Sequence, residues 1–342
     1  MILRNTLYGI NDVTIIPSSI TSVKSRFDCD CRDANGKLPL IVSPMSSVVN
    51  EKSFSKFLES GMYVVLPRTL PIEFRIETAL AYNGVFAALG LSEAAKMFLN
   101  NDETKRLLAP DDCKIGICID VANGHMTQLI DLAAFIKKQY GDKVMLMVGN
   151  IANPSTYEKY ASANIDYVRV GIGSGSVCTT SANSGVHYPM ASLLNAIRDI
   201  RSKMNGKTPD VIADGGFDSF DKIIKALALG ANYVMIGKIP AQSNEACGEV
   251  FYVDGRPCRN YYGMSTKKAQ REMNKSEDEL RTSEGVMKQV PILYSIFNWV
   301  DNFSHYLREA MSMTNSLTLE QFTSGDVILM PMTASAYYNY YK

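Results

Sequence analysis

The chain has 342 residues, of which 46% are hydrophobic and 20% charged, a balance typical of a globular protein with a sizeable core. Lys and Arg together number 35, as do Asp and Glu, so no net charge draws the chain to nucleic acid or to an anionic membrane. The seven cysteines are scattered and form no Cys-x-x-Cys pair, which favours a reducing cytoplasmic compartment over a disulfide framework or zinc site. No run approaches the roughly eighteen apolar residues of a membrane span, and no signal peptide is expected.

The first forty residues are irregular, with a turn expected at residues 34–37. Eight short apolar runs of strand type follow, at Leu40–Ser43, Met62–Leu66, Val85–Leu91, Lys114–Ala122, Val144–Gly149, Tyr167–Ile172, Val211–Asp214 and Tyr233–Gly237. Segments with helical periodicity alternate with them, at Glu51–Glu59, Pro71–Asn83, Ser92–Leu108, Met126–Tyr140, Pro154–Ala163, Pro189–Met204 and Ser219–Leu229. The nearly continuous apolar runs are typical of parallel strands buried on both faces. This alternation predicts a single-domain (β/α)8 TIM barrel, with a doubly wound open sheet as the alternative.

Residues 241–291 depart from this pattern and are polar. Within them, Val250–Val253 and Cys258–Tyr262 flank a turn sequence, which predicts a hairpin. The charged stretch at residues 267–284 is either a solvated helical face or a mobile lid over the barrel mouth. A closing helix is expected at residues 293–313. The tyrosine-rich tail at residues 334–342 is expected to pack on a neighbouring subunit or to be loose.

Polar and glycine residues follow nearly all of the expected strands, where barrels of this kind gather their chemistry. Asp214 could bind a ribose diol, and the glycines after it, Gly215 and Gly216, let a backbone approach a ligand. The loops after the seventh and eighth strands commonly hold phosphate in these barrels. We therefore expect a phosphorylated ribose between Ser176, Asp214 and Gly237.

The stretch at residues 171–180, GIGSGSVCTT, leaves a strand through closely spaced glycines and then reaches Cys178. Such glycines can aim backbone N–H groups at a phosphate, although a tight turn with a half-buried thiol fits the same pattern. Cys178 is the candidate nucleophile, acting as a thiolate. Thr180 could hydrogen-bond the leaving group, and Glu284 could be the general acid if the lid folds back. The three histidines show no metal or triad spacing and are expected to have ordinary polar roles.

Over about residues 10–320 the chain resembles the IMP dehydrogenase/GMP reductase family. GIGSGSVCTT is similar to the family's catalytic cysteine loop, and IADGG, ALALGANYVMIG, YYGMS and SPM follow its other blocks. Dehydrogenases usually carry a regulatory domain after the second-strand helix, for which Pro71–Val85 leaves no room, and an Arg-Tyr pair absent from residues 264–284. DVANGH at 120–125 and RTSEGVMKQVP at 281–291 are instead similar to GMP reductase. The resemblance therefore implies NADPH-dependent reductive deamination of GMP to IMP and ammonia, in a homotetramer.

The resemblance also implies a role for each matching residue. Cys178 would attack purine C2, Thr180 and Glu284 would assist loss of the amino group, and potassium would bind the carbonyls of Gly173, Gly175 and Cys178. The nucleotide would be held by Ser43, Met45, Ser176, Asp214, Gly215, Gly216, Gly237, Lys238, Met264 and Ser265. NADPH would lie near Arg68, Asp120, Asn150, Arg281 and Ser283.

Four positions depart from the family pattern. The carboxylate that usually follows Ser-Pro-Met is replaced by Ser46, and the basic pair that usually follows Cys-Thr-Thr is replaced by Ser181-Ala182. The Lys-His pair usual after the second strand is replaced by Arg68-Thr69, and the family's small-residue run before Gly-Glu is replaced by Glu245-Ala246-Cys247. These changes leave a deoxynucleotide open as the substrate. Two other functions also stay open: an IMP dehydrogenase without the regulatory domain, forming XMP with NAD, and a non-catalytic nucleotide-binding or oligomeric scaffold.

Overall fold

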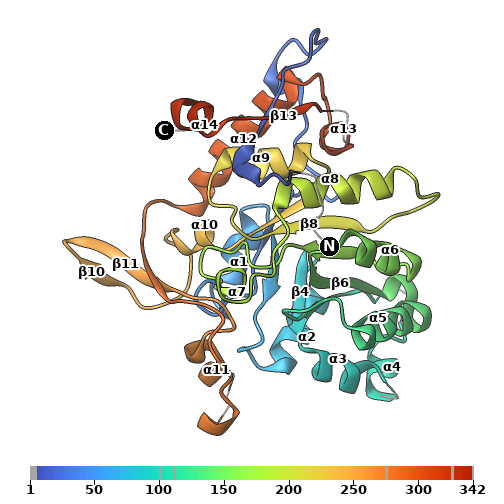
Figure 1. The fold of residues 1–342 in the computed structure, drawn as a ribbon. Helices are drawn as coiled ribbons and strands as arrows, with labels where there is room; N and C mark the ends of the chain where they lie inside the picture. The colour runs from blue at the N-terminus through green and yellow to red at the C-terminus, as the bar shows by residue number, and fades with distance from the viewer. Residues whose placement is uncertain (1–5, 100–101, 111–112, 274–275, 325–326, 341–342) are drawn as a thin grey trace.

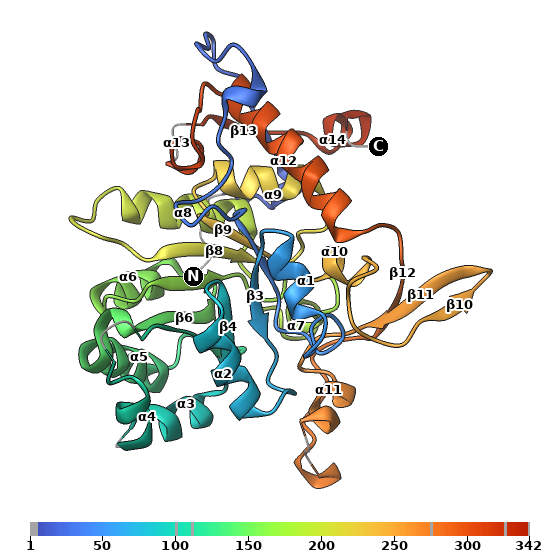
Figure 2. The ribbon, with the colours of Figure 1, turned by 180° about the vertical axis from the view of Figure 1, so that it is seen from behind.

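The computed structural model describes residues 6–99, 102–110, 113–273, 276–324 and 327–340. Eight parallel strands close into a barrel in chain order, with helices around it (Figures 1 and 2). The strands are Leu40–Val42 (β2), Tyr63–Leu66 (β3), Val85–Leu89 (β4), Ile115–Asp120 (β5), Val144–Ile151 (β6), Tyr167–Val170 (β7), Asp210–Asp214 (β8) and Tyr233–Ile236 (β9). Because β2 also pairs with β9, the sheet has no open edge. The predicted TIM barrel is confirmed, and the open-sheet alternative is wrong.

The predicted helices follow the strands with one exception, and two short helices, at residues 180–184 and 238–241, were not predicted. The helices are Phe54–Glu59 (α1), Ile72–Ala81 (α2), Leu91–Phe98 (α3), Asp102–Leu107 (α4), Thr127–Tyr140 (α5), Pro154–Ser162 (α6), Thr180–Ser184 (α7), Met190–Arg201 (α8), Phe220–Ala228 (α9) and Lys238–Ala241 (α10). The exception is the single helix expected at Ser92–Leu108, which is wrong, because Leu99 takes an extended conformation that ends α3. Short 3₁₀ helices lie at Ile10–Asp12 (η1), Arg26–Asp28 (η2), Gly141–Lys143 (η3) and Glu277–Glu279 (η4).

The barrel strands have a core on each face, because successive side chains of a strand point to opposite sides. Ile41, Val65 and Met147 belong to the core inside the barrel. Their neighbours Leu40 and Val64 belong to the larger core between the strands and the helices. Burial on both faces explains why these strands read as continuous apolar runs in the sequence.

Aromatic side chains fill the N-terminal end of the barrel. Tyr63, Phe86, Tyr167 and Tyr233 stand at the starts of their strands and meet edge to face, with the Tyr63 and Tyr233 ring centroids 5.4 Å apart. The hydroxyls of Tyr63 and Tyr233 both donate to the carboxylate of Asp33, which lies before β2. These rings fill much of the barrel interior at its N-terminal end.

A three-stranded antiparallel sheet follows the barrel. It consists of Phe251–Val253 (β10), Arg256–Tyr261 (β11) and Lys288–Pro291 (β12), and its hairpin projects away from the barrel in both ribbon views (Figures 1 and 2). The strand β12 was not predicted from the sequence. The chain between β11 and β12, which we call the lid, contains Lys267–Glu272 (α11) and η4.

The two ends of the chain meet on one side of the molecule. Val13–Ile15 (β1) pairs antiparallel with Leu329–Pro331 (β13), a contact that was missed because three-residue strands show too little periodicity. Ile296–Met313 (α12) lies where the closing helix was expected and buries Phe303 and Leu307, and Leu319–Thr323 (α13) follows. The tail forms Ala334–Tyr340 (α14), which has no buried residue. Within the described ranges, no helix combines the length and the apolar character needed to cross a membrane.

Candidate active site

A cavity opens at the C-terminal ends of the barrel strands, between the strand-end loops and the start of the lid. Every residue expected to hold the nucleotide lines it, although these residues come from widely separated segments. They are Ser43, Met45, Ser176, Asp214, Gly215, Gly216, Gly237, Lys238, Met264 and Ser265. Cys178, Gly173 and Gly175 line the same cavity, as do Asp120 and Asn150 from the cofactor set. Barrel closure therefore brings strand ends far apart in sequence around the Cys178 thiol.

The loop that carries Cys178 depends on glycine where the chain turns away from β7. Gly171 has a φ of +127°, and a Cβ there would collide with the backbone oxygen of Asp214. Beyond this turn, the Cys178 N–H donates to the Gly175 carbonyl at 3.0 Å. The Cys178 Sγ lies 3.1 Å from the Thr180 Oγ1, at the first residue of α7. The loop thus presents a thiol with a hydroxyl beside it.

The end of the lid pairs with this loop. Cys178 stands opposite Gly285 in an isolated antiparallel bridge, in which the Thr179 N–H donates to the Glu284 carbonyl at 3.0 Å. The Val286 N–H donates to the Val177 carbonyl, also at 3.0 Å. A Cβ at Gly285 would lie 2.8 Å from the Val177 oxygen, so this approach requires glycine. Glu284 is therefore next to the thiol loop in space, with an exposed side chain.

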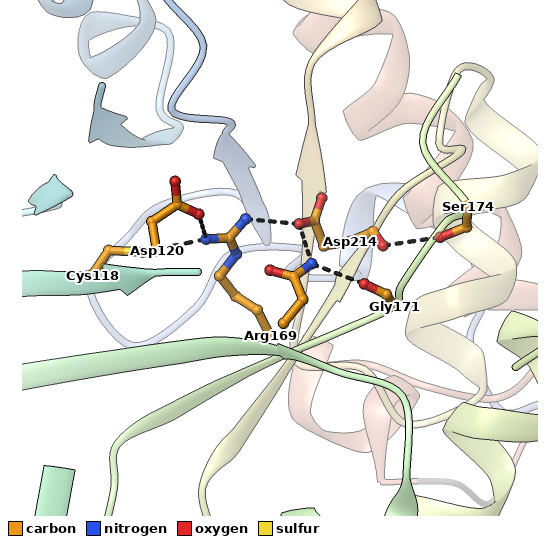
Figure 3. A network of polar contacts seen from close by, with 7 residues as sticks. Cys118, Asp120, Arg169, Gly171, Ser174 and Asp214 are labelled. Atoms are coloured by element: carbon orange, nitrogen blue, oxygen red, sulfur yellow. Dashed lines mark hydrogen bonds and ion pairs between the residues drawn. The ribbon is translucent and has the colours of Figure 1, made fainter. Parts of the chain in front are cut away.

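A buried arginine joins two of the predicted site residues, as Figure 3 shows. Arg169 Nη1 donates to Asp120 Oδ1 at 2.6 Å, and Arg169 Nη2 donates to Asp214 Oδ2 at 2.9 Å. The arginine side chain is 6% exposed, and those of Asp120 and Asp214 are 18% and 16% exposed. Burial alone would lower the pKa of Arg169, but the two carboxylates outweigh it and raise that pKa well above its ordinary value.

The same network orients the Asp214 carboxylate. Asn150 Nδ2 donates to Asp214 Oδ2 at 2.8 Å and to the Gly171 carbonyl at 2.9 Å. Because Oδ2 already accepts from both Arg169 and Asn150, the other carboxylate oxygen is the acceptor left for a ligand in the cavity that Asp214 lines. A carboxylate held in this way suits the hydroxyl groups of a ribose.

Arg169 was missed in the sequence, although a signal for it exists. It is the one charged residue in the apolar run at 167–170, and it lies two residues after Tyr167, which packs inside the barrel. Asp120 and Asp214 likewise lie two residues after the inward-facing Cys118 and Ile212. Strand periodicity therefore points all three charges at the barrel axis, near its open end.

Tyr261 is a second cavity residue that the sequence analysis did not assign. It lines the cavity from the end of β11, and burial raises the pKa of its hydroxyl. A Cβ at Gly237 would lie 2.7 Å from the Tyr261 hydroxyl and 2.9 Å from the Met45 sulfur. Beside them, Lys238 Nζ donates to Asp218 Oδ2 at 2.9 Å. Burial would raise the pKa of Asp218, but hydrogen bonds from Lys222 and Lys238 outweigh it and hold that pKa below its ordinary value.

Three residues of the expected cofactor set do not line the cavity. Arg68 Nε donates to Glu93 Oε2 at 3.1 Å, next to the start of α3. The Arg281 backbone exchanges hydrogen bonds with the Gln270 side chain, and the Ser283 hydroxyl donates to the Gly285 carbonyl. Of the expected cofactor set, Asp120 and Asn150 line the cavity, and the cofactor role of the other three stays a prediction.

The carbonyls expected to bind potassium are in part already hydrogen-bonded. Ser181 Oγ donates to the Gly173 carbonyl at 2.8 Å, and the Gly175 carbonyl accepts the Cys178 N–H. Position 181 is one of those that depart from the family pattern, since it holds a serine where the family has a basic residue. The hydroxyl of this serine reaches the Gly173 carbonyl. Across the described residues, no group of three or more His, Cys, Asp or Glu side chains is arranged to hold a metal ion.

Other titratable side chains near the strand ends have structural partners. The imidazole of His125 lies 2.8 Å from Thr156 Oγ1 and accepts the Ala152 N–H at 3.1 Å, and burial lowers its pKa. Burial raises the pKa of Cys118 to about 12 and that of Cys247 to about 11, so both stay thiols near neutral pH. Within the part of the chain that the structure describes, Cys178 is the thiol that faces the cavity.

The sequence of the chain is similar to those of known proteins. Residues 8–339 match the family model of the IMP dehydrogenase / GMP reductase domain. The chain is 29% identical over 329 residues to a GMP reductase of Vibrio atlanticus, covering 92% of each chain. It is 30% identical, with the same coverage, to GMP reductases of Vibrio campbellii and Aliivibrio fischeri. The chain belongs to the IMP dehydrogenase/GMP reductase family.

Proposed function

We propose that this protein is a GMP reductase, converting GMP, NADPH and a proton to IMP, NADP⁺ and ammonia. The observation that carries the proposal is the backbone pairing of the Cys178 loop with the Glu284 segment. This pairing brings the Glu284 backbone within hydrogen-bonding distance of the loop that carries Cys178 and Thr180, which supports roles for these three residues as acid, nucleophile and neighbouring hydroxyl. The similarity to proteins named GMP reductase supports the same conclusion.

The reaction assigns a step to each of these side chains. The Cys178 thiolate adds to C2 of the purine and forms a carbon–sulfur bond. The 2-amino group leaves as ammonia once Glu284, through the Thr180 hydroxyl, has given it a proton, because an unprotonated aromatic amine is a poor leaving group. Bound NADPH supplies the hydride that replaces the amino group at C2. The carbon–sulfur bond then breaks, and the thiolate is regenerated.

We assign the residues that line the cavity to two ligands, the nucleotide and the cofactor. Asp214 would hold the ribose, and the loops around Ser176, Gly216 and Gly237 would hold the phosphate, at the usual phosphate position of these barrels. Asp120 and Asn150 fit the cofactor side, because each is polar and faces the cavity that contains the Cys178 thiol. The carbonyls of Gly173, Gly175 and Cys178 remain our candidate ligands for a monovalent cation. Since Ser181 already donates to Gly173, we propose that the cation is an accessory rather than a requirement.

For the assembly we propose a homotetramer, as the family resemblance implies. Burial of apolar surface between subunits would favour it, because Tyr252 on the projecting hairpin and Tyr338 on α14 are each 73% exposed. Analytical ultracentrifugation of the full chain tests this directly, and a monomer at micromolar concentration would contradict it.

The test of function is the oxidation of NADPH at 340 nm with GMP and dGMP in parallel, and with IMP plus NAD⁺ in a third arm. We expect turnover in a guanine-nucleotide arm and its loss in Cys178→Ala. NADH formation from IMP would replace the proposal with a dehydrogenase. Binding of GMP without turnover in any arm would replace it with a non-catalytic nucleotide-binding protein.

A further inference from the structure

A carboxylate of the lid lies against the loop that follows β2. Glu272, the last residue of α11, accepts a hydrogen bond on each of its oxygens. Ser46 Oγ donates to Glu272 Oε2 at 2.6 Å, and the Tyr262 hydroxyl donates to Glu272 Oε1 at 2.6 Å. Hydrogen bonds to an ionised carboxylate are shorter and stronger than those between neutral groups. These two contacts therefore fasten the end of α11 to a fixed part of the barrel rim.

The start of the lid is anchored to the same loop. Ser47 Oγ donates to the Tyr262 carbonyl at 2.9 Å and accepts the Tyr262 N–H at 3.2 Å, and Ser47 is buried. The Lys268 ammonium, in the first turn of α11, lies 4.8 Å from the centre of the Tyr262 ring. Ser47 thus holds the chain ahead of α11, and Glu272 holds the far end of the helix.

The two segments that Glu272 joins form two walls of the cavity. Met45 lines it immediately before Ser46, and Met264 and Ser265 line it immediately before α11. Glu272 itself does not line the cavity. Without the Glu272 contacts, the lid between its anchors at Tyr262 and Gly285 would lose a fastening to the barrel. More of it would then have to be ordered when a ligand binds, and that ordering weakens binding.

We propose that Glu272 is a positioning residue, which holds the lid against Ser46 and so sets the affinity of the site for its purine nucleotide. The nucleotide in this statement rests on the proposed function. In the family pattern the carboxylate belongs to position 46, whereas in this chain position 46 supplies the hydroxyl and the lid supplies the carboxylate. In this chain, the carboxylate of this contact is therefore that of Glu272.

Four variants test the pair. Glu272→Leu keeps the bulk of the side chain but removes both acceptors, and Ser46→Asp brings two carboxylates together at this contact. Glu272→Gln keeps an oxygen for Tyr262 and offers an N–H to the Ser46 hydroxyl, which can turn to accept it. Ser46→Asp/Glu272→Gln pairs the same N–H with the new carboxylate. Glu277→Leu is the matched control, because it removes an exposed lid carboxylate whose partner, Arg271, is also exposed.

Two measurements read out the result: hydrogen–deuterium exchange of residues 262–285 without nucleotide, and the KM and kcat for GMP. Glu272→Leu and Ser46→Asp should speed exchange of the lid and raise KM at least about tenfold, with a smaller change in kcat. Glu272→Gln, the double variant and the control should stay within about twofold of the wild type. Wild-type exchange and KM in Glu272→Leu, or no recovery in the double variant, would overturn the inference. Failure of the wild type to turn over GMP would overturn the proposed function, while the exchange comparison still decides whether Glu272 holds the lid.

Discussion

Replacing Arg169 by methionine tests whether this buried cation holds the site together. The substitution keeps an unbranched side chain but removes the donors that lie 2.6 Å from Asp120 and 2.9 Å from Asp214. Asp214 keeps its hydrogen bond from Asn150 at 2.8 Å, whereas Asp120 loses the ion pair on its Oδ1 and stays 18% exposed. The main penalty is therefore one partly buried carboxylate without compensation.

The expected magnitude follows from that environment. Removing one partner of a buried ion pair typically costs about 3–5 kcal/mol of folding free energy. A domain's total stability is about 5–15 kcal/mol, so Arg169→Met should lose about a fifth of it or more. Arg169→Lys should lose less, since one ammonium can still reach one of the two carboxylates. Arg169→Met/Asp120→Asn should recover stability, because it removes the uncompensated charge.

Urea denaturation at pH 7, monitored by circular dichroism, measures these differences in stability. The midpoint urea concentration should shift while the dependence of the unfolding free energy on urea stays unchanged. Arg106→Met is the control, because Arg106 is exposed on α4 and its loss should change stability by no more than about 0.5 kcal/mol. Lowering the pH neutralises carboxylates and should narrow the deficit of Arg169→Met. A deficit below about 1 kcal/mol, or no recovery on adding Asp120→Asn, would refute the role given to Arg169.

Three further outcomes are expected. Cys178→Ala should abolish GMP-dependent oxidation of NADPH, whereas Cys113→Ala, which removes a thiol outside the cavity, should retain it. Ser181→Ala frees the Gly173 carbonyl to bind a cation. The melting temperature of this variant should therefore be higher in a potassium salt than in the choline salt; an equal difference in the wild type would contradict this. Burial raises the pKa of Asp210 to about 6 from 3.8, so the folded state loses stability as the pH rises between these values. Asp210→Asn should therefore gain about 3 kcal/mol over the wild type at pH 7 and almost nothing below pH 4, as urea denaturation would show.

The barrel could be predicted from the sequence because its main signal is local. Each parallel strand is buried on both faces, so it appears as an apolar run, and each helix that follows has its own periodicity and boundary residues. At the start of α6, for example, Asn153 accepts the Ser155 N–H directly before Pro154, a signal confined to three residues. The strands that were missed, β1, β12 and β13, are short and take their order from a partner far along the chain.

The candidate site was predictable only where its chemistry is local as well. The glycines and Cys178 lie within ten residues of each other, so their pattern is visible without a fold. The role of Arg169 depends on its ion pairs with Asp120 and Asp214, which are 49 and 45 residues away in the chain. The closed barrel decides which strand residues face its axis. A lone arginine in an apolar run does not by itself indicate which carboxylates it will pair with.

The contact of Ser46 with Glu272 shows that the absence of a family residue from the sequence does not by itself mean that its functional group is lost. The structure must first be inspected for another residue that supplies the group. By sequence alone, Ser46 removes a carboxylate from the nucleotide side, and restoring it by Ser46→Asp should improve the site. In the structure, the Glu272 carboxylate already lies 2.6 Å from the Ser46 hydroxyl, 226 residues away in the chain. Two carboxylates at that separation repel each other, so one of them would have to move or take up a proton. Aspartate at position 46, the substitution that restores the family's carboxylate, should therefore weaken nucleotide binding unless Glu272 is replaced as well.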